Sequence, residues 1–520
     1  MSGRGALRGA LVTAVWTLLS RILGFARDAV MLATFGASSA TGNFVIAWMV
    51  PNLARRLFGE GAVSAAVQPA LARVQQQQGA EASHRLYARF QGLLLVALAV
   101  LVIGGELVVL GWRAALLAQP VPGEALAAAA RAADLEALEL TAMLLPYVVP
   151  ICLTALAGAP QQLSGRFSLP ALAPAMLNVV WISWLLFLGP GADILWLPAG
   201  VLVGGLMQWL MQWPGLRADG WPLLPRRPGG DPELRSSVRA FFPVLLGLAA
   251  IQLNLMIDQI LVRELVSEQA NSYTYAANRL LQLPMALVGI SAATGAMPLF
   301  AKLAAEGRRE ELAGHLRTGV ELTLLLMIAA GGGLFVLAAP VITVLFEHGR
   351  FTAADTAALT PVLQAYLWSL PASALIGLAA RACQASGNLR GPAQAAVAAI
   401  PINLGLDLLL LPRMGVAGAG YATAVALSFQ FLLLTRMLGA LRLGPVLGLA
   451  RLPRLLLPGL AATAAAWGTT LALGAQASSA LGVVLGIGAG VLAATLAARL
   501  LLPDDFAQLV AVLRRRRRRV

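Results

Sequence analysis

The sequence has few charged residues for its 520-residue length: Asp, Glu, Lys and Arg make up 12% of it, whereas hydrophobic residues make up 59%. Soluble domains are nearer one quarter charged, so this composition excludes a soluble globular protein. The two cysteines and three histidines form neither a disulfide pattern nor a metal-ligand spacing. The phosphate-binding loop of ATPases is also missing, which argues against direct drive by ATP. We expect no cleavable signal peptide, because the first apolar run is too long for one.

Apolar stretches of 18 or more residues recur along the whole chain, which is typical of a polytopic helical membrane protein. We predict an all-α fold of about fourteen transmembrane helices, arranged as two six-helix lobes and a C-terminal helix pair. The corresponding domains are residues 1–225, 226–443 and 444–520, the last with a polybasic tail. The predicted spans lie near 11–35, 42–67, 90–111, 138–157, 169–188, 194–213, 240–261, 273–299, 318–338, 358–380, 393–411, 415–435, 456–474 and 481–502.

The distribution of positive charge predicts the orientation. If both termini are cytoplasmic, the large majority of the 38 Lys and Arg residues fall in cytoplasmic segments, as the positive-inside rule requires. We therefore expect a multi-pass membrane protein with both termini cytoplasmic. Topology accounts for the net charge of +14, so no nucleic-acid partner is expected. The run Arg514–Arg519 predicts attraction to anionic membrane lipids.

A short repeat supports two lobes. Gln162, Ser164 and Gly165, followed by Pro170, recur 222 residues later as Gln384, Ser386 and Gly387, followed by Pro392. Both copies fall in predicted cytoplasmic loops, after the fourth and the tenth span. A shift of six spans preserves orientation, so the lobes are predicted to be parallel repeats, a construction that places the substrate between the halves.

A few charged side chains lie inside predicted spans, where each costs ~3 kcal/mol on insertion scales and usually faces a cavity or a partner. An arginine side chain presents a planar fork of donors that matches phosphate. We predict that Arg27, Arg55 and Arg279 converge on one water-accessible cavity between the lobes. The candidate substrate-binding residues are Arg21, Arg27, Asp28, Arg55, Arg56, Glu60 and Arg279.

The competing interpretation is that each arginine either is paired locally, Arg27 with Asp28 and Arg56 with Glu60 one turn later, or snorkels to a membrane surface. On helical spacing Asp28 shares a face with Arg21, whereas Arg27 is predicted to point elsewhere.

A second polar set lies in the predicted second lobe: Asp258 in the seventh span, Asn403 and Asp407 one turn apart in the eleventh, and Thr423 in the twelfth. Carboxylate, carboxamide and hydroxyl oxygens suit a small hard cation. We treat these residues as a candidate sodium site, with a proton site as one alternative. The other alternative is a set of protonated or hydrogen-bonded acids that only join helices.

Several motifs resemble the MurJ (MviN) family of lipid II flippases, within the multidrug/oligosaccharidyl-lipid/polysaccharide exporter superfamily. The resemblance covers the first to at least the twelfth span. It rests on SRILGFARD at 20–28, FGA at 35–37, PNLARRLFGEGA at 51–62, GRFSLP at 165–170 with Asn178 downstream, YAANRL at 275–280 and GRFT at 349–352.

The resemblance implies a two-lobe transporter whose central cavity binds the diphosphate-sugar-peptide head group of undecaprenyl-linked lipid II, and moves it outward by alternating access. It implies that Arg21, Arg27, Arg55 and Arg279 are functional, that the last two helices form a groove for the lipid tail, and that the second polar set resembles the sodium site of some members. The sequence departs from the family in having Gly42 with Asn43 where an acid is frequent, Met49 for a lysine, and Asn278 for an acid.

Other functions stay open. One is a flippase for another lipid-linked oligosaccharide, and another is a cation-coupled drug exporter of the same superfamily, although the latter needs an acidic cavity. A membrane-embedded transferase or phosphatase needs carboxylates or histidines beside the arginines, and these are missing. We therefore expect a secondary-type transporter rather than an enzyme, acting as a monomer with lipid II and membrane lipids as partners. A scaffold without transport explains neither the buried charges nor the repeat.

Overall fold

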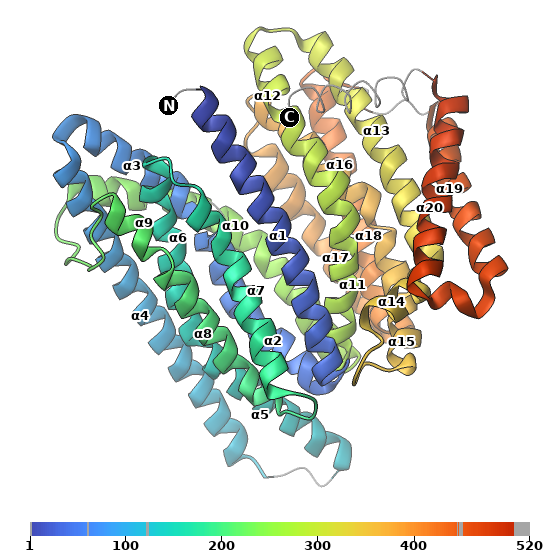
Figure 1. The fold of residues 1–520 in the computed structure, drawn as a ribbon, viewed down its shortest axis with the longest axis horizontal. Coiled ribbons are helices and arrows are strands. Elements are labelled where there is room, and N and C mark those ends of the chain that lie inside the picture. The colour runs from blue at the N-terminus through green and yellow to red at the C-terminus, as the bar shows by residue number, and fades with distance from the viewer. Residues whose placement is uncertain (1–2, 60–61, 121–123, 445, 447–450, 504–520) are drawn as a thin grey trace. The chain divides into compact units, whose positions relative to one another are not determined.

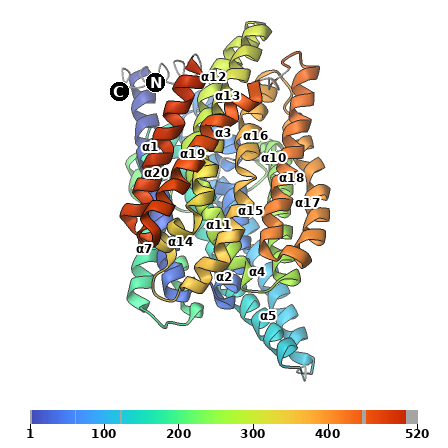
Figure 2. The same cartoon turned by 90° about the vertical axis from the view of Figure 1, so that its right-hand side faces the viewer.

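The computed structural model describes residues 3–59, 62–120, 124–444, 446 and 451–503, and all regular structure in these ranges is helical (Figures 1 and 2). The chain divides into two compact units, Met1–Met256 and Ile257–Val520. The predicted all-α class is therefore confirmed. Glu60 and the basic run 514–519 lie outside the described residues.

The first unit consists of helices joined by turns and, between α9 and α10, by a longer segment. Its elements are α1 (Gly3–Phe35), α2 (Ser39–Ala54), the π-helical turn η1 (Arg55–Gly59), α3 (Ala62–Gln78), α4 (Ala80–Ala118), α5 (Ala125–Leu144), η2 (Leu145–Tyr147), α6 (Val148–Leu163), α7 (Ser168–Leu188), η3 (Ile194–Trp196), α8 (Leu197–Leu210), α9 (Trp213–Ala218) and the first part of α10 (Pro232–Leu265).

The second unit contains the end of α10 and the remaining helices. These are α11 (Ala270–Pro284), the π-helical turn η4 (Met285–Gly289), α12 (Ile290–Ala305), α13 (Arg309–Val336), α14 (Ala338–Phe346), α15 (Ala353–Leu367), α16 (Leu370–Ala385), α17 (Gly391–Met414), α18 (Val416–Ala440), α19 (Leu452–Leu473), η6 (Gly474–Ser478) and α20 (Ala480–Leu501).

Ten helices of the described chain are long and apolar enough to cross a membrane, so this is a multi-pass membrane protein. Every predicted span coincides with a helix or a broken pair of helices, but fourteen crossings stay a prediction. The four predicted spans outside the ten are those in α1, α2–α3, α10 and α11–α12. They are also the spans that carry the intramembrane arginines and Asp258.

The two units share a break in their second long helix. In the first unit η1 interrupts α2 and α3 and packs on α6, and in the second η4 interrupts α11 and α12 and packs on α16. A proline precedes each π-turn: Pro51 lies four residues before the start of η1, and Pro284 lies directly before η4. Proline removes a backbone donor, so the normal ladder of hydrogen bonds is interrupted near these turns.

The repeated motif forms the same turn twice. Gly165 and Gly387 both have positive φ, 79° and 88°. The Gly165 N–H donates to the Gln162 carbonyl, and the next N–H donates to the carbonyl of residue 161; Gly387 and residue 388 bond to residues 384 and 383 in the same way. This pair of bonds with a left-handed glycine is the Schellman helix end. It gives α6 and α16 the same termination and supports the predicted repeat.

The segment between α9 and α10 is folded back on the first unit rather than extended as a free linker. Trp221 is buried, with its ring 4.4 Å from that of His84 and 5.6 Å from that of Tyr87. Arg89 pairs with Asp231, and the Arg226 N–H donates to the Ala88 carbonyl at 2.8 Å. The units therefore divide inside α10, at 256–257, farther along the chain than the predicted boundary at 225–226.

The C-terminal pair α19–α20 packs against α13 of the second unit, as both views show (Figures 1 and 2). The contact is close because glycines face it. A Cβ on Gly459 would lie 2.4 Å from Cγ2 of Ile328, and one on Gly332 would lie 2.1 Å from Oγ1 of Thr463. Small residues let helix backbones approach in this way. α19 therefore packs directly against α13.

Candidate functional site

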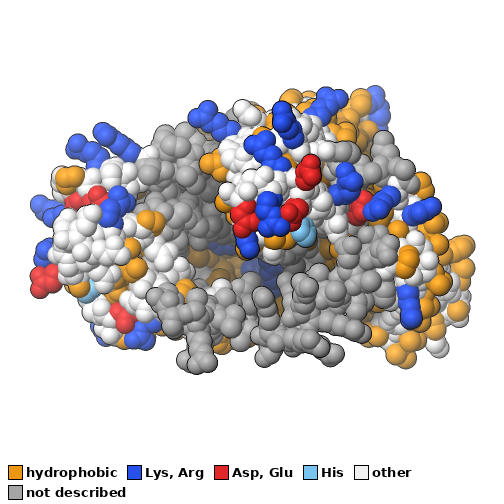
Figure 3. Space-filling view, turned by 90° about the horizontal axis from the view of Figure 1, so that it is seen from above, with side chains coloured by type: hydrophobic (Ala, Val, Ile, Leu, Met, Phe, Trp, Pro, Cys, Tyr) orange, Lys and Arg blue, Asp and Glu red, His pale blue; other side chains and the backbone are white. Residues whose placement is uncertain are grey.

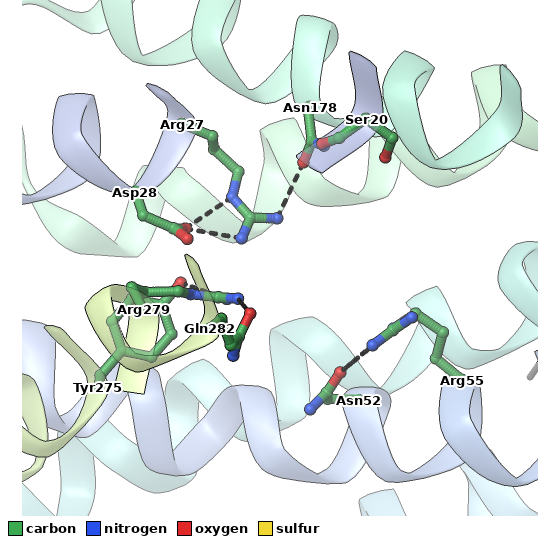
Figure 4. A network of polar contacts seen from close by, with 9 residues as sticks. All are labelled: Ser20, Arg27, Asp28, Asn52, Arg55, Asn178, Tyr275, Arg279 and Gln282. Carbon is green, nitrogen blue, oxygen red and sulfur yellow. Dashed lines mark hydrogen bonds and ion pairs between the residues drawn. The ribbon is translucent and has the colours of Figure 1, made fainter. Parts of the chain in front are cut away.

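Arg27 of α1 is almost completely buried, with 7% of its surface exposed, and Asp28 is fully buried. The Nε and Nη2 groups of Arg27 both donate to Oδ1 of Asp28, at 2.9 and 2.6 Å (Figure 4). Local pairing therefore holds for Arg27, and the prediction that it points away from Asp28 is wrong. Consecutive residues do not face each other on a helix, but the long arginine side chain folds across to its neighbour.

α7 supplies the other contacts of Arg27. Oδ1 of Asn178 accepts from Nη1 at 3.1 Å, and the guanidinium carbon lies 4.5 Å from the centre of the Trp181 ring. A cation over an aromatic face gains about 0.5–2 kcal/mol, more when water is excluded. Sequence reasoning noted Asn178 only as a family match and missed Trp181. The available signal was an asparagine and a tryptophan one turn apart in an otherwise apolar span.

Arg55 and Arg56 lie in the π-turn η1. Arg55 donates from Nε and Nη2 to Oδ1 of Asn52, at 3.2 and 3.0 Å (Figure 4). Arg56 donates from Nη1 to Oε1 of Gln252 in α10 at 3.1 Å. Each of these hydrogen bonds goes to the oxygen of a side-chain amide and orients the guanidinium.

Arg279 of α11, in the second unit, contacts side chains of its own helix. Its Nη2 donates to the Tyr275 hydroxyl at 3.0 Å, its Nη1 donates to Gln282 at 3.3 Å, and its guanidinium carbon lies 4.7 Å over the Tyr275 ring (Figure 4). Tyr275 stands one turn before Arg279, so the helix itself provides the stacking platform. Arg21, by contrast, is exposed.

Three of the four candidate sodium-site residues, Asp258, Asn403 and Asp407, come together in the second unit. The Asn403 side-chain nitrogen donates to Oδ1 of Asp258 at 2.6 Å and to Oδ2 of Asp407 at 3.1 Å. Thr423 contacts Tyr366 instead. Tyr366 in turn lies near the carboxylates of Asp258 and Asp407. Sequence reasoning missed Tyr366.

The donor set of this cluster fits a small cation. Asn403 and Asp407 are 3% and 1% exposed, and among the described residues no group donates a hydrogen bond to the buried Oδ1 of Asp407. A buried carboxylate oxygen without a donor is costly. A cation held by carboxylate, amide and hydroxyl oxygens would satisfy it.

Comparison with known proteins shows which family the chain belongs to. The family model described as Lipid II flippase MurJ matches residues 31–490. The chain belongs to the MurJ family. A lipid II flippase MurJ of Burkholderia cenocepacia is 32% identical over 433 residues, which cover 82% of each chain. A probable lipid II flippase MurJ of Haemophilus influenzae is 30% identical over 440 residues, 81% of this chain and 84% of the relative.

Solved structures agree on the MurJ fold. A structure described as lipid II flippase MurJ in an inward closed conformation matches with a TM-score of 0.79 at 22% identity, covering 95% of this chain and 99% of the other. An inward-facing MATE family multidrug resistance transporter of the MOP superfamily matches with a TM-score of 0.66 at 14% identity, over 83% and 99% of the two chains. At these identities the likeness concerns the fold, which the MurJ family shares with MATE transporters.

Proposed function

We propose that this protein is a lipid II flippase, which moves undecaprenyl-diphosphate-linked peptidoglycan precursor from the cytoplasmic to the periplasmic leaflet by alternating access. The observation that carries the proposal is a set of arginine side chains whose guanidinium groups are carried by α1, η1 and α11, in a chain of the MurJ family. Membrane-embedded guanidinium groups oriented by fixed partners suit a diphosphate. The curated relatives are named for the same substrate.

In this proposal Arg27, Arg55 and Arg279 bind the diphosphate, and Arg21, Arg56, Asp28 and Glu60 assist them. The exposed position of Arg21 suits an early contact with the lipid head group. Arg55 and Arg279 suit substrate binding because neighbouring side chains orient their guanidinium groups, Asn52 for Arg55 and Tyr275 for Arg279. Two nitrogens of the Arg27 guanidinium donate to Asp28, so a phosphate oxygen would bind to the N–H groups that remain.

The proposed protein is a secondary-type transporter, not an enzyme, and acts as a monomer in the bacterial cytoplasmic membrane with both termini cytoplasmic. In support of this orientation, Lys and Arg are frequent among the described side chains that Figure 3 shows. Sodium bound by Asp258, Asn403, Asp407 and Thr423 would favour one conformation, since a ligand with equal affinity for both shifts nothing.

The test is rescue of a bacterium depleted of its own lipid II flippase, together with flipping of lipid II in proteoliposomes. Wild type should rescue growth, whereas Arg27→Ala, Arg55→Ala and Arg279→Ala should fail at normal protein level. Lysine at these positions should restore part of the activity, because it keeps the charge without the fork. Arg85→Ala is the matched control, since Arg85 is exposed and paired with Glu81.

A rival substrate gives a different result. If the wild type moves another lipid-linked oligosaccharide or a cationic drug but not lipid II, the proposed function is wrong. If all three alanine variants keep full activity, the arginines do not bind the substrate.

A further inference from the structure

Two side chains of α7 fix the orientation of the Arg27 guanidinium. Asp28 alone cannot do so, because Nε and Nη2 share a single oxygen of its carboxylate, and the plane can pivot about one acceptor. Asn178 holds the remaining terminal nitrogen from α7, and the Trp181 ring covers one face. The three contacts together define both the edge and the plane of the guanidinium.

Asn178 is itself held by the backbone of α1. Its Nδ2 donates to the Ser20 carbonyl at 2.9 Å, while its Oδ1 accepts from Arg27. Asn178 lies directly against Gly24, since a Cβ there would lie 3.4 Å from Nδ2, in van der Waals contact. One amide thus connects the α1 backbone with the charged end of an α1 side chain, so a change in α1 at this point also changes the contact with Arg27.

Trp181 is held by its ring rather than by its N–H. It is 1% exposed and packs edge-on against Phe44, at 5.7 Å and 83°, and against Trp48, at 5.3 Å and 81°. Its Nε1 has no hydrogen-bond partner among the described residues. A buried indole is usually hydrogen-bonded. This position therefore uses the aromatic face, which is the surface that meets Arg27.

We propose that Asn178 and Trp181 are positioning residues for substrate recognition by Arg27, an inference that rests on the proposed function. They orient the Arg27 guanidinium so that the N–H groups that do not donate to Asp28 or Asn178 can donate to one anionic oxygen of a diphosphate. Arginine carries further donors beyond those contacts, so the substrate can bind without first displacing Asn178. Loss of either residue lets the guanidinium leave this orientation, and the affinity for the diphosphate falls.

The transport experiment uses Asn178→Ala, Trp181→Leu and Trp181→Phe in the full chain, with Trp184→Leu as control. Trp184 lies on the same helix, but it packs on Gly200 of α8 and bonds to the Trp196 carbonyl. Asn178→Ala and Trp181→Leu should each raise KM for lipid II about fivefold to tenfold, the loss expected of one cation-centred contact, with the maximal rate nearly unchanged. Trp181→Phe keeps an aromatic face and should restore most of the affinity.

A second experiment needs no substrate. The purified proteins are treated with phenylglyoxal, and labelling of Arg27 is measured by mass spectrometry of its peptide. Labelling should rise several-fold in Asn178→Ala and Trp181→Leu but not in Trp184→Leu. Equal labelling in all variants, or a KM change no larger than that of Trp184→Leu, overturns the inference. Failure of the wild type to flip lipid II overturns the proposed function instead, and the labelling result still decides how Arg27 is held.

Discussion

The side-chain nitrogen of Asn403 lies 2.6 Å from a carboxylate oxygen of Asp258, which joins α17 to the end of α10 inside the second unit. The same nitrogen donates to Asp407, so one neutral amide serves two acids. An amide carries only partial positive charge and compensates two buried carboxylates incompletely. A small cation at this point would bind both acids, with the oxygen of Asn403 turned toward it.

We therefore predict that sodium stabilises the wild-type protein more than potassium does. A ligand at 100 times its Kd adds about 2.7 kcal/mol to the free energy of unfolding, so Tm in detergent should rise with sodium concentration. Asp407→Asn should abolish the rise. Glu81→Gln, which changes a 90% exposed acid, should preserve it. If the wild type has the same Tm in both salts, these residues do not bind sodium and only join the helices.

Gly92 of α4 lets the segment before α10 dock. A Cβ there would lie 1.9 Å from the Arg226 carbonyl oxygen, a backbone atom that cannot move alone. Gly92→Ala should reduce the free energy of unfolding by about 1–3 kcal/mol through overpacking and release the segment. Trypsin cleavage after Arg226 and Arg227 would detect the release.

Gly104→Ala in the same helix is the matched control for that substitution. Nothing lies within 4 Å of a Cβ at Gly104, and alanine is favoured over glycine in a helix by about 1 kcal/mol. This variant should be as resistant to trypsin as the wild type. Equal cleavage of the two variants would mean that the close approach of Arg226 to α4 is not needed for docking.

Gly459 holds α19 against α13. A Cβ at this residue would lie 2.4 Å from Cγ2 of Ile328 and 3.2 Å from its backbone carbon, so Gly459→Ala should separate the helices and lower stability by about 1–3 kcal/mol. Gly468→Ala in α19 has nothing within 4 Å and should be neutral or stabilising. Thermal unfolding in detergent measures both. The same Tm for both variants would show that the helix pair tolerates separation.

Glu321 of α13 is buried, at 2% exposure, and pairs with Arg451 at the start of α19 at 3.2 Å. Arg451→Ala leaves a buried carboxylate without this partner, which should cost about 1–3 kcal/mol. The value falls at the low end because the Arg451 side chain is 60% exposed and solvent screens the pair. Adding Glu321→Gln should restore much of the Tm. Arg451→Ala with no loss, or no recovery in the double variant, would show that the pair contributes little.

The sequence alone determined the helical class, the positions of the helices and the repeat, because these depend on local properties. Apolar length sets a helix that crosses lipid, and a glycine after Gln162 and Gln384 sets the same helix end twice. The charged residues were also found from the sequence, since charge inside an apolar run is visible without any structure. The cluster of Asp258, Asn403 and Asp407 was predicted for the same reason.

Tertiary structure decided which groups those charges contact. The stacking of Arg27 on Trp181 and the bond to Asn178 join residues about 150 positions apart, a separation of 151 for the bond, and no local pattern encodes such a contact. The pairing of Arg27 with Asp28 depended on the rotamer, which packing against α7 selects. The docked segment at Trp221 likewise looked like a linker, because proline, glycine and arginine indicate a loop but not the surface it covers. The order of residues in the sequence located the charged groups of this protein, whereas packing between distant helices selected their partners.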